Sequence, residues 1–172
     1  SYISCVPEVM VVPYGQPIEV PGAPNREGYE FVCWNTKSDG TGKSYKPGDK
    51  ITEIPISKYI DLYSIWKQKE YVLTYNLNNG QQNVVKAVKY GEKITKIEDP
   101  VKEGHKFIGW YYLGEAFDFE NSQMPSNNMA LEAKYLKEVS ITFLSFGETY
   151  KTIKGYETEE IKENITNLSK EG

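Results

Sequence analysis

An internal repeat is the feature of this 172-residue chain that most restricts its fold. Seven positions occupied by aromatic residues, glycine, proline and glutamate recur at a constant offset of 76 residues. They are Tyr14, Gly15, Pro24, Glu27, Gly28, Phe31 and Trp34 in the first copy, and Tyr90, Gly91, Pro100, Glu103, Gly104, Phe107 and Trp110 in the second. Self-similarity at a fixed spacing marks tandem copies of one small structural unit. We therefore expect a row of similar modules rather than one large domain.

The end of each copy sets the expected module boundaries. After the tryptophan the offset falls to 69, because the segment ending in Trp66 matches the segment ending in Tyr135. The first copy therefore carries extra residues, which we place in the turn-rich stretch 35–49. A third copy begins near Val139. The expected modules are 1–67 with a shortened front strand, 70–136, and a partial third module, 138–172, that consists of a β-hairpin and a helix; the chain would then be a fragment of a longer protein.

Hydrophobic periodicity predicts modules that are mostly β. Tyr71, Leu73, Tyr75 and Leu77 alternate with Val72, Thr74 and Asn76, the two-residue period typical of a half-buried strand. Further strands are expected at 84–90, 107–112, 116–119 and 129–135, and a hairpin at 139–154 with a type II′ turn led by Gly147. One or two helical turns are expected between Gly91 and Pro100, and a helix carrying Ile161, Ile165 and Leu168 follows the hairpin. The fold class expected is α+β, as tandem β-grasp-like, or ubiquitin-like, modules.

Composition excludes several classes of partner. Twenty basic and 24 acidic side chains give a net charge of −4, without a basic run. Binding to nucleic acid or to an anionic membrane surface needs clustered lysine and arginine, so neither is expected. The apolar stretches are far shorter than the roughly 20 residues that cross a bilayer, so membrane insertion is not expected.

The repeated aromatic residues are expected to build the core of each module. A large ring that recurs at one strand position usually fills the interior, so Trp34 and Trp110 are interpreted as core residues. The glycine of each Glu-Gly pair is interpreted as a turn residue that needs positive φ. Trp66 and Tyr135 end the last strand of their copies and complete this structural signature.

No residue pattern predicts catalysis or a cofactor. His105 is the only histidine and replaces Tyr29 of the first copy, so a structural position is expected for it. Asp118 and Glu120 could share one strand face as a hydrolase pair, but surface carboxylates are the commoner reason for such spacing. Residues 39–44 lack the spacing of a phosphate-binding loop, and a weak cation site at Asp39 and Asp49 is the open alternative to two ordinary turns. The protein is expected to be no enzyme and to bind neither cofactor nor resident metal.

Cys5 and Cys33 are the only two cysteines. If the chain is exported they could form a disulfide; a buried free thiol at Cys33 is the alternative.

The strings Arg26–Asn35 and Lys102–Tyr111, each followed by a strand ending in Trp66 or Tyr135, resemble the Listeria–Bacteroides surface repeat, the family that includes the B-repeat of Listeria internalins. The resemblance implies a non-catalytic β-grasp-like module that bacteria export and display, secreted or attached to the cell wall, in tandem beside adhesion modules. Cys33 departs from the pattern, which usually has glycine there, as Gly109 does in the second copy.

Two functions of different class are compatible with these residues. The first is a non-catalytic surface repeat that acts as spacer, adhesion or protein-interaction unit. Its candidate partners are neighbouring modules of a longer surface protein and a host or bacterial surface protein. The second is a carbohydrate-binding module for a cell-wall or host glycan. It is motivated by 23 aromatic residues, of which Tyr59, Tyr111 and Tyr112 could lie on an exposed face and contact the ligand. The unfinished third module should either pack on the second or recruit a strand from another chain.

Overall fold

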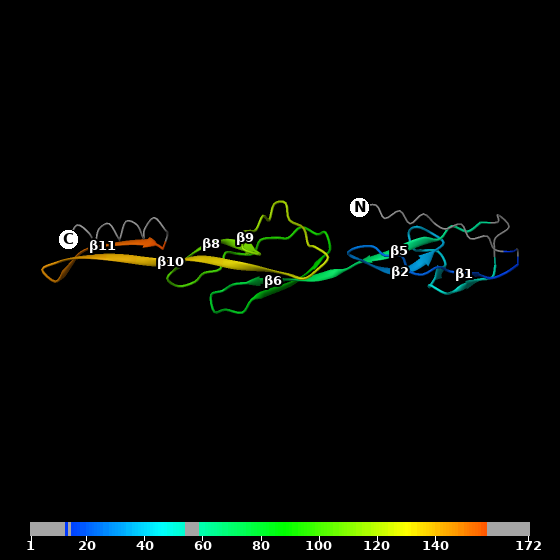
Figure 1. Ribbon diagram of the computed structural model, residues 1–172, viewed down its shortest axis with the longest axis horizontal. Coiled ribbons are helices and arrows are strands. Elements are labelled where there is room, and N and C mark those ends of the chain that lie inside the picture. Colours follow the sequence, from blue (N-terminus) through cyan, green and yellow to red (C-terminus); the bar gives the residue numbers. More distant parts are fainter. Residues whose placement is uncertain (1–12, 14, 54–58, 158–172) are drawn as a thin grey trace. The chain divides into compact units, whose positions relative to one another are not determined.

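The computed structural model describes residues 13, 15–53 and 59–157, and the chain divides into two compact units (Figure 1). Unit 1 comprises Ser1–Glu70 together with Lys89–Gly91, and unit 2 comprises Tyr71–Val88 and Glu92–Gly172. All regular structure in the described ranges is β.

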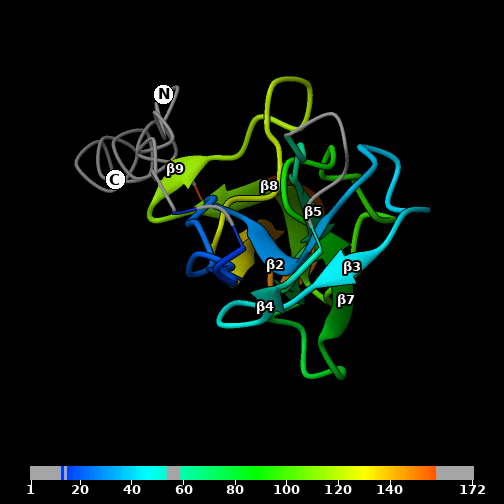
Figure 2. The same ribbon diagram turned by 90° about the vertical axis from the view of Figure 1, so that its right-hand side faces the viewer.

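Unit 1 contains two small sheets, and the strands of the larger one are labelled in Figure 2. The three-stranded sheet has the order β3-β2-β5, built from β2 (Tyr29–Asn35), β3 (Ser44–Tyr45) and β5 (Tyr63–Gln68), and both pairings are antiparallel. The second sheet pairs β1 (Ile18–Glu19) with β4 (Lys50–Ile51). Its core is small: the buried residues Val20, Tyr45 and Ile51, against which Ile18, Trp34, Ile60 and Leu62 pack.

Unit 2 is organised around one long strand. The strands of its sheet are β6 (Glu70–Asn76), β7 (Val84–Lys89), β8 (His105–Tyr112), β9 (Glu115–Ala116) and β10 (Met129–Ser145), in the order β7-β6-β10-β8-β9. β10 is parallel to β6 and antiparallel to β8. It then continues beyond this sheet and pairs with β11 (Glu148–Tyr156), as Figure 1 shows.

The two copies pair their strands in matching register. Trp34 of β2 lies opposite Ser64 of β5, and Trp110 of β8 lies opposite Ala133 of β10. Trp110 follows Trp34 by 76 residues and Ala133 follows Ser64 by 69, which are the two offsets of the repeat. Each pairing also contains one bulge.

The alternation predicted for residues 71–77 is confirmed. Leu73, Tyr75 and Leu77 are 1%, 0% and 7% exposed, whereas Val72, next to Leu73, is exposed and Thr74 and Asn76 are half-buried. The buried side chains join Ile94, Trp110, Met124, Met129, Leu131 and Ala133 in the core of unit 2. One face of β6 is therefore in the core and the other faces solvent, which is the physical origin of the two-residue period.

The helical turns expected between Gly91 and Pro100 are wrong. Ile94 is 1% exposed, but its amide donates to Ser122 O at 3.3 Å, and Glu92 O accepts from Met124 N at 2.8 Å. The segment is extended because a distant part of the chain provides its hydrogen bonds. The helix expected at Ile161, Ile165 and Leu168 lies outside the described residues. In the part that is described, the α+β class is corrected to all-β.

Two further details differ from expectation. The strand expected at 116–119 is limited to β9, because Asp118 accepts the main-chain N–H groups of Glu120 and Asn121 and so forms a turn. The third-copy hairpin closes at Phe146 and Gly147, with φ of 52° and 84°. Two central residues with positive φ form a type I′ turn rather than the expected type II′ turn.

Candidate functional site

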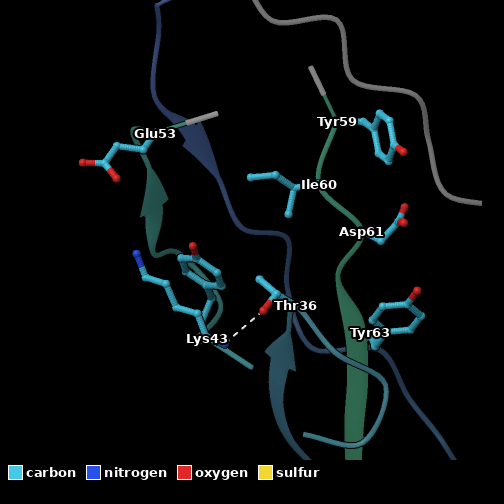
Figure 3. A pocket seen from close by; sticks show the side chains of 8 residues that line it. Thr36, Lys43, Glu53, Tyr59, Ile60, Asp61 and Tyr63 are labelled. Atoms are coloured by element: carbon cyan, nitrogen blue, oxygen red, sulfur yellow. Dashed lines mark hydrogen bonds between the residues drawn. The ribbon is translucent and has the colours of Figure 1, made fainter. Parts of the chain in front are cut away.

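An open depression of about 410 Å³ in unit 1 is the candidate site (Figure 3). It is lined by Thr36, Lys43, Tyr45, Glu53, Tyr59, Ile60, Asp61 and Tyr63. Three of these side chains are tyrosines, two are carboxylates and one is an ammonium group. Such a lining offers apolar ring faces together with groups that accept or donate hydrogen bonds.

Tyr59, Asp61 and Tyr63 form a ridge along one side of the extended chain that leads into β5. Their side chains leave the chain on the same side, while Ile60 points to the other side (Figure 3). Alternation along an extended chain explains this arrangement. Ile60 and Leu62 pack on the core, so the ridge faces outward. Tyr59 is 69% exposed and Tyr63 is 43% exposed.

The loop between β2 and β3 supplies another part of the lining, and buried Asn35 organises this loop. The Nδ2 of Asn35 lies within hydrogen-bonding distance of Gly40 O, Gly42 O and Ser44 Oγ, and its Oδ1 accepts from Lys37 N and Gly42 N. Thr36 Oγ1 accepts from Lys43 N at 2.9 Å, and the Nζ of Lys43 lies 5.2 Å from the centre of the Tyr45 ring. This loop, which lies within the stretch where the extra residues of the first copy are expected, is thus ordered beside the ridge.

The other two tyrosines singled out from the sequence lie elsewhere. Tyr111 and Tyr112 are neighbours on β8, so they point to opposite faces of the unit 2 sheet. Both are half-buried: the Nζ of Lys134 lies 4.0 Å from the centre of the Tyr111 ring, and Tyr112 packs against Phe117 and the core. They therefore form no shared platform. Asp61 and Tyr63 were not singled out, although the alternation of Tyr59, Asp61 and Tyr63 with two apolar residues could have revealed them.

The signature aromatics lie within the two units. Trp110 is 3% exposed, and its ring meets those of Tyr75 and Phe107 edge to face at 5.2 and 5.8 Å. Tyr135 donates its hydroxyl to Leu77 O at 2.6 Å. Trp34 is half-buried and donates Nε1–H to Pro21 O.

The centre of the Phe31 ring lies 5.6 Å from the ring centres of both Trp34 and Trp66. The signature glycines Gly15, Gly28, Gly91 and Gly104 all have positive φ, between 65° and 84°. Tyr14 lies outside the described residues.

The carboxylates considered for chemistry are engaged in local turns. The Asn121 side-chain amide, followed by the Glu120 N–H, lowers the pKa of Asp118. The Thr41 N–H and hydroxyl lower the pKa of Asp39. Asp49 accepts from Lys46 N at 2.7 Å. Hydrogen bonding to a carboxylate stabilises its charged form, so Asp39 and Asp118 act as caps of their local turns.

His105 and Cys33 complete the residues singled out. The Nδ1 of His105 lies 2.8 Å from Glu103 O, and its ring meets Tyr135 at 6.3 Å. Cys33 is half-buried on β2, and its predicted partner Cys5 lies outside the described residues, so the disulfide stays a prediction. Residues 13, 15–53 and 59–157 include no cluster of three possible metal ligands and no helix with the length and apolarity to cross a bilayer.

Residues 4–64 and 71–134 match the Listeria–Bacteroides repeat domain, so two copies of this domain cover most of the chain. A putative Gly-rich membrane protein of Evansella cellulosilytica is 40% identical over 71% of this chain and 14% of its own length. A putative membrane protein of the same organism is 36% identical over 73% of this chain and 19% of its own length. Internalin H of Listeria monocytogenes is 30% identical over 70% of this chain and 21% of its own length. The chain therefore spans less than a quarter of the length of these curated relatives. On this evidence, the chain belongs to the Listeria–Bacteroides repeat domain family.

Proposed function

We propose that the chain is a non-catalytic tandem repeat of a bacterial surface protein, where it acts as a spacer, adhesion or protein-interaction unit between neighbouring modules. The observation that carries this proposal is the matching register of the two copies, since a repeated sheet of this kind builds length without a reactive centre. The names of the relatives, two membrane proteins and an internalin, support a position at the cell surface, secreted or wall-attached.

The strand order of unit 2 supports a β-grasp-like module. In the order β7-β6-β10-β8-β9, the first and last long strands of the copy, β6 and β10, are parallel neighbours at the centre. The expected boundaries at 1–67, 70–136 and 138–172 are retained as part of this proposal.

Surface position and spacing are tested in the parent protein in its native bacterium. Trypsin applied to intact cells should release peptides from residues 15–157, while a cytosolic marker stays uncut. Replacing the two repeats by a flexible Gly-Ser segment of equal length should reduce antibody access to the module beyond them, and reinserting the repeats should restore it. Peptides that appear only after lysis, or access unaffected by the replacement, would contradict the proposal.

A second candidate function is glycan binding at the Tyr59–Asp61–Tyr63 ridge. Two exposed rings flanking a carboxylate can cover the apolar face of a sugar and accept hydrogen bonds from its hydroxyls. The test is a glycan array with Tyr59→Ala and Tyr63→Ala, and with Tyr150→Ala as control because Tyr150 is 79% exposed in unit 2. Signal lost in the two ridge variants and kept in the control supports this function. Silence of the unmodified chain across cell-wall and host glycans removes it.

A further inference from the structure

Tyr90 belongs by sequence to the second repeat, yet its contacts place it in unit 1 with the first. Its N–H donates to Lys69 O at 2.9 Å, and its carbonyl accepts from Gln68 Nε2 at 2.5 Å. Its ring meets the Tyr29 ring edge to face, with 6.0 Å between centres. Both the main chain and the side chain of Tyr90 are therefore held by residues of the first repeat and its linker.

Gly28 provides the surface on which the Tyr90 ring lies. A Cβ placed on Gly28 would come within 2.1 Å of two ring carbons of Tyr90, closer than any real contact. Gly28 also has φ of +73°, and its carbonyl accepts from Lys69 N at 2.9 Å. The glycine thus forms the turn, anchors the linker and leaves room for the ring.

The Tyr29 ring also contacts Arg26, another residue of unit 1. The guanidinium of Arg26 lies 3.9 Å from the centre of the Tyr29 ring and 5.9 Å from that of Trp66. Cation–π contact and edge-to-face packing orient these groups. Tyr90 therefore meets a surface that the first repeat has already organised.

Half of this arrangement recurs after the second repeat. Gly104 O accepts from Glu138 N at 2.7 Å, and Lys137 O accepts from Glu157 N at 2.8 Å. The main-chain hydrogen bonds therefore follow the repeat. The ring does not: in the described part of the chain, a Cβ on Gly104 would meet no heavy atom within 4 Å.

We propose that the Gly28–Tyr29 surface is a docking site for the Tyr-Gly turn of the following repeat, so that one repeat recognises the next through Tyr90. The hydrogen bonds at Lys69 supply the general link between repeats, and the ring of Tyr90 on Gly28 supplies the part specific to this pair. This goes beyond a spacer role, because the order of the repeats would then depend on which repeat can bind the Tyr-Gly turn of the next. It does not depend on what the array presents or binds.

The two glycines offer a matched comparison. Gly28→Ala and Gly104→Ala introduce the same methyl group at similar φ, +73° and +65°, but only the first meets a ring. The readout is the rate of tryptic cleavage after Lys67, Lys69 and Lys89 in the full chain, which follows transient opening when closing is fast. We expect Gly28→Ala and Tyr90→Ala to raise this rate about tenfold or more, since an aromatic pair and its supporting contacts are lost. Gly104→Ala should stay within about twofold of wild type.

A double variant separates docking from a general loss of folding. If the added methyl group acts by displacing the Tyr90 ring, Gly28→Ala combined with Tyr90→Ala should cleave no faster than Tyr90→Ala alone. Hydrogen exchange of peptides from β2 shows whether the first repeat remains folded in each variant. Equal cleavage rates for Gly28→Ala and Gly104→Ala, or a Tyr90→Ala rate within twofold of wild type, would overturn the proposal. Surface display of the parent protein could survive that result, so the two proposals fail independently.

Discussion

Removing the Asn35 side chain should destabilise unit 1 much more than a typical substitution near a loop. Asn35 is 0% exposed, and its amide holds the loop between β2 and β3 through main-chain groups of Lys37, Gly40 and Gly42. The alanine variant keeps the strand but leaves these groups without their partner. Since Tyr111 occupies the equivalent position in the second copy, the effect should be confined to unit 1.

The expected size follows from the hydrogen bonds. The amide has two protons and one oxygen with two lone pairs, so about four hydrogen bonds at roughly 0.5–1.5 kcal/mol each are lost. Lys37 and Ser44 are exposed, so water can replace part of this network. We therefore expect Asn35→Ala to cost about 2–3 kcal/mol. With a slope near 1 kcal/mol per molar urea for a unit of this size, the midpoint should fall by about 2–3 M.

The Asn35→Asp variant adds a dependence on pH. The new carboxylate keeps the acceptor but is buried against the carbonyls of Gly40 and Gly42, so its pKa should rise above that of the unfolded chain. Its cost should therefore be smallest below about pH 4, where both states bind the proton, and should grow as the pH rises toward neutrality. The cost of Asn35→Ala should not change over this range.

Urea titration followed by circular dichroism gives the stabilities, and hydrogen exchange of peptides from β2 and β8 assigns the loss to unit 1 or unit 2. The amides of Lys37 and Gly42 donate to Asn35 Oδ1, so they should exchange faster in Asn35→Ala, whereas Asn35→Asp keeps their acceptor. A cost below about 0.5 kcal/mol for Asn35→Ala would refute the reasoning. An Asn35→Asp variant whose stability relative to wild type is the same at pH 4 and pH 7 would refute it as well.

Four other substitutions test unit 2. Leu131→Ala should cost about 2.7–5 kcal/mol in urea unfolding, because Leu131 is 0% exposed in the core, whereas Val85→Ala on the exposed face should change stability by less than about 0.5 kcal/mol. Tyr75→Phe removes the hydroxyl that donates to Thr95 O at 2.6 Å and should cost about 1 kcal/mol. Burial raises the pKa of Tyr75, so wild type should lose stability as the pH rises above 10.0, whereas Tyr75→Phe should not show this loss. If the stabilities of the two proteins fall in parallel as the pH rises above 10.0, this prediction is contradicted. Hydrogen bonds lower the pKa of Asp118 from 3.8, so its contribution should be present above that pH and vanish as the pH falls through the folded-state value, and thermal midpoints of wild type and Asp118→Asn should converge in acid.

The strands were predictable where one face is buried. Residues 71–77 show this directly, because Leu73 and Tyr75 enter the core and Val72 does not. The helical turn expected around Ile94 was wrong for a related reason. The spacing of the apolar residues shows that one side of the segment around Ile94 is apolar. A short segment, however, takes the conformation that its hydrogen-bond partners allow, and here those partners are Ser122 and Met124.

The candidate site was only partly predictable. Tyr59 could be proposed as an exposed tyrosine, and it lines the depression in unit 1. Tyr111 and Tyr112 could not be distinguished from it by residue type, although the first packs beneath Lys134 and the second against the core. Exposure depends on what lies above a strand face, and sequence spacing does not contain that information.

The amino-acid sequence by itself determined that the chain repeats, how far apart equivalent residues lie and which side chains share a strand face. These properties follow from offsets and from the two-residue period of a strand, which are local. Only the tertiary structure decided that Asn35 orders the inserted loop and that Tyr90 lies on Gly28 with the first repeat. Both depend on which distant groups supply hydrogen bonds and room for a ring, and those partners meet only when the chain has folded.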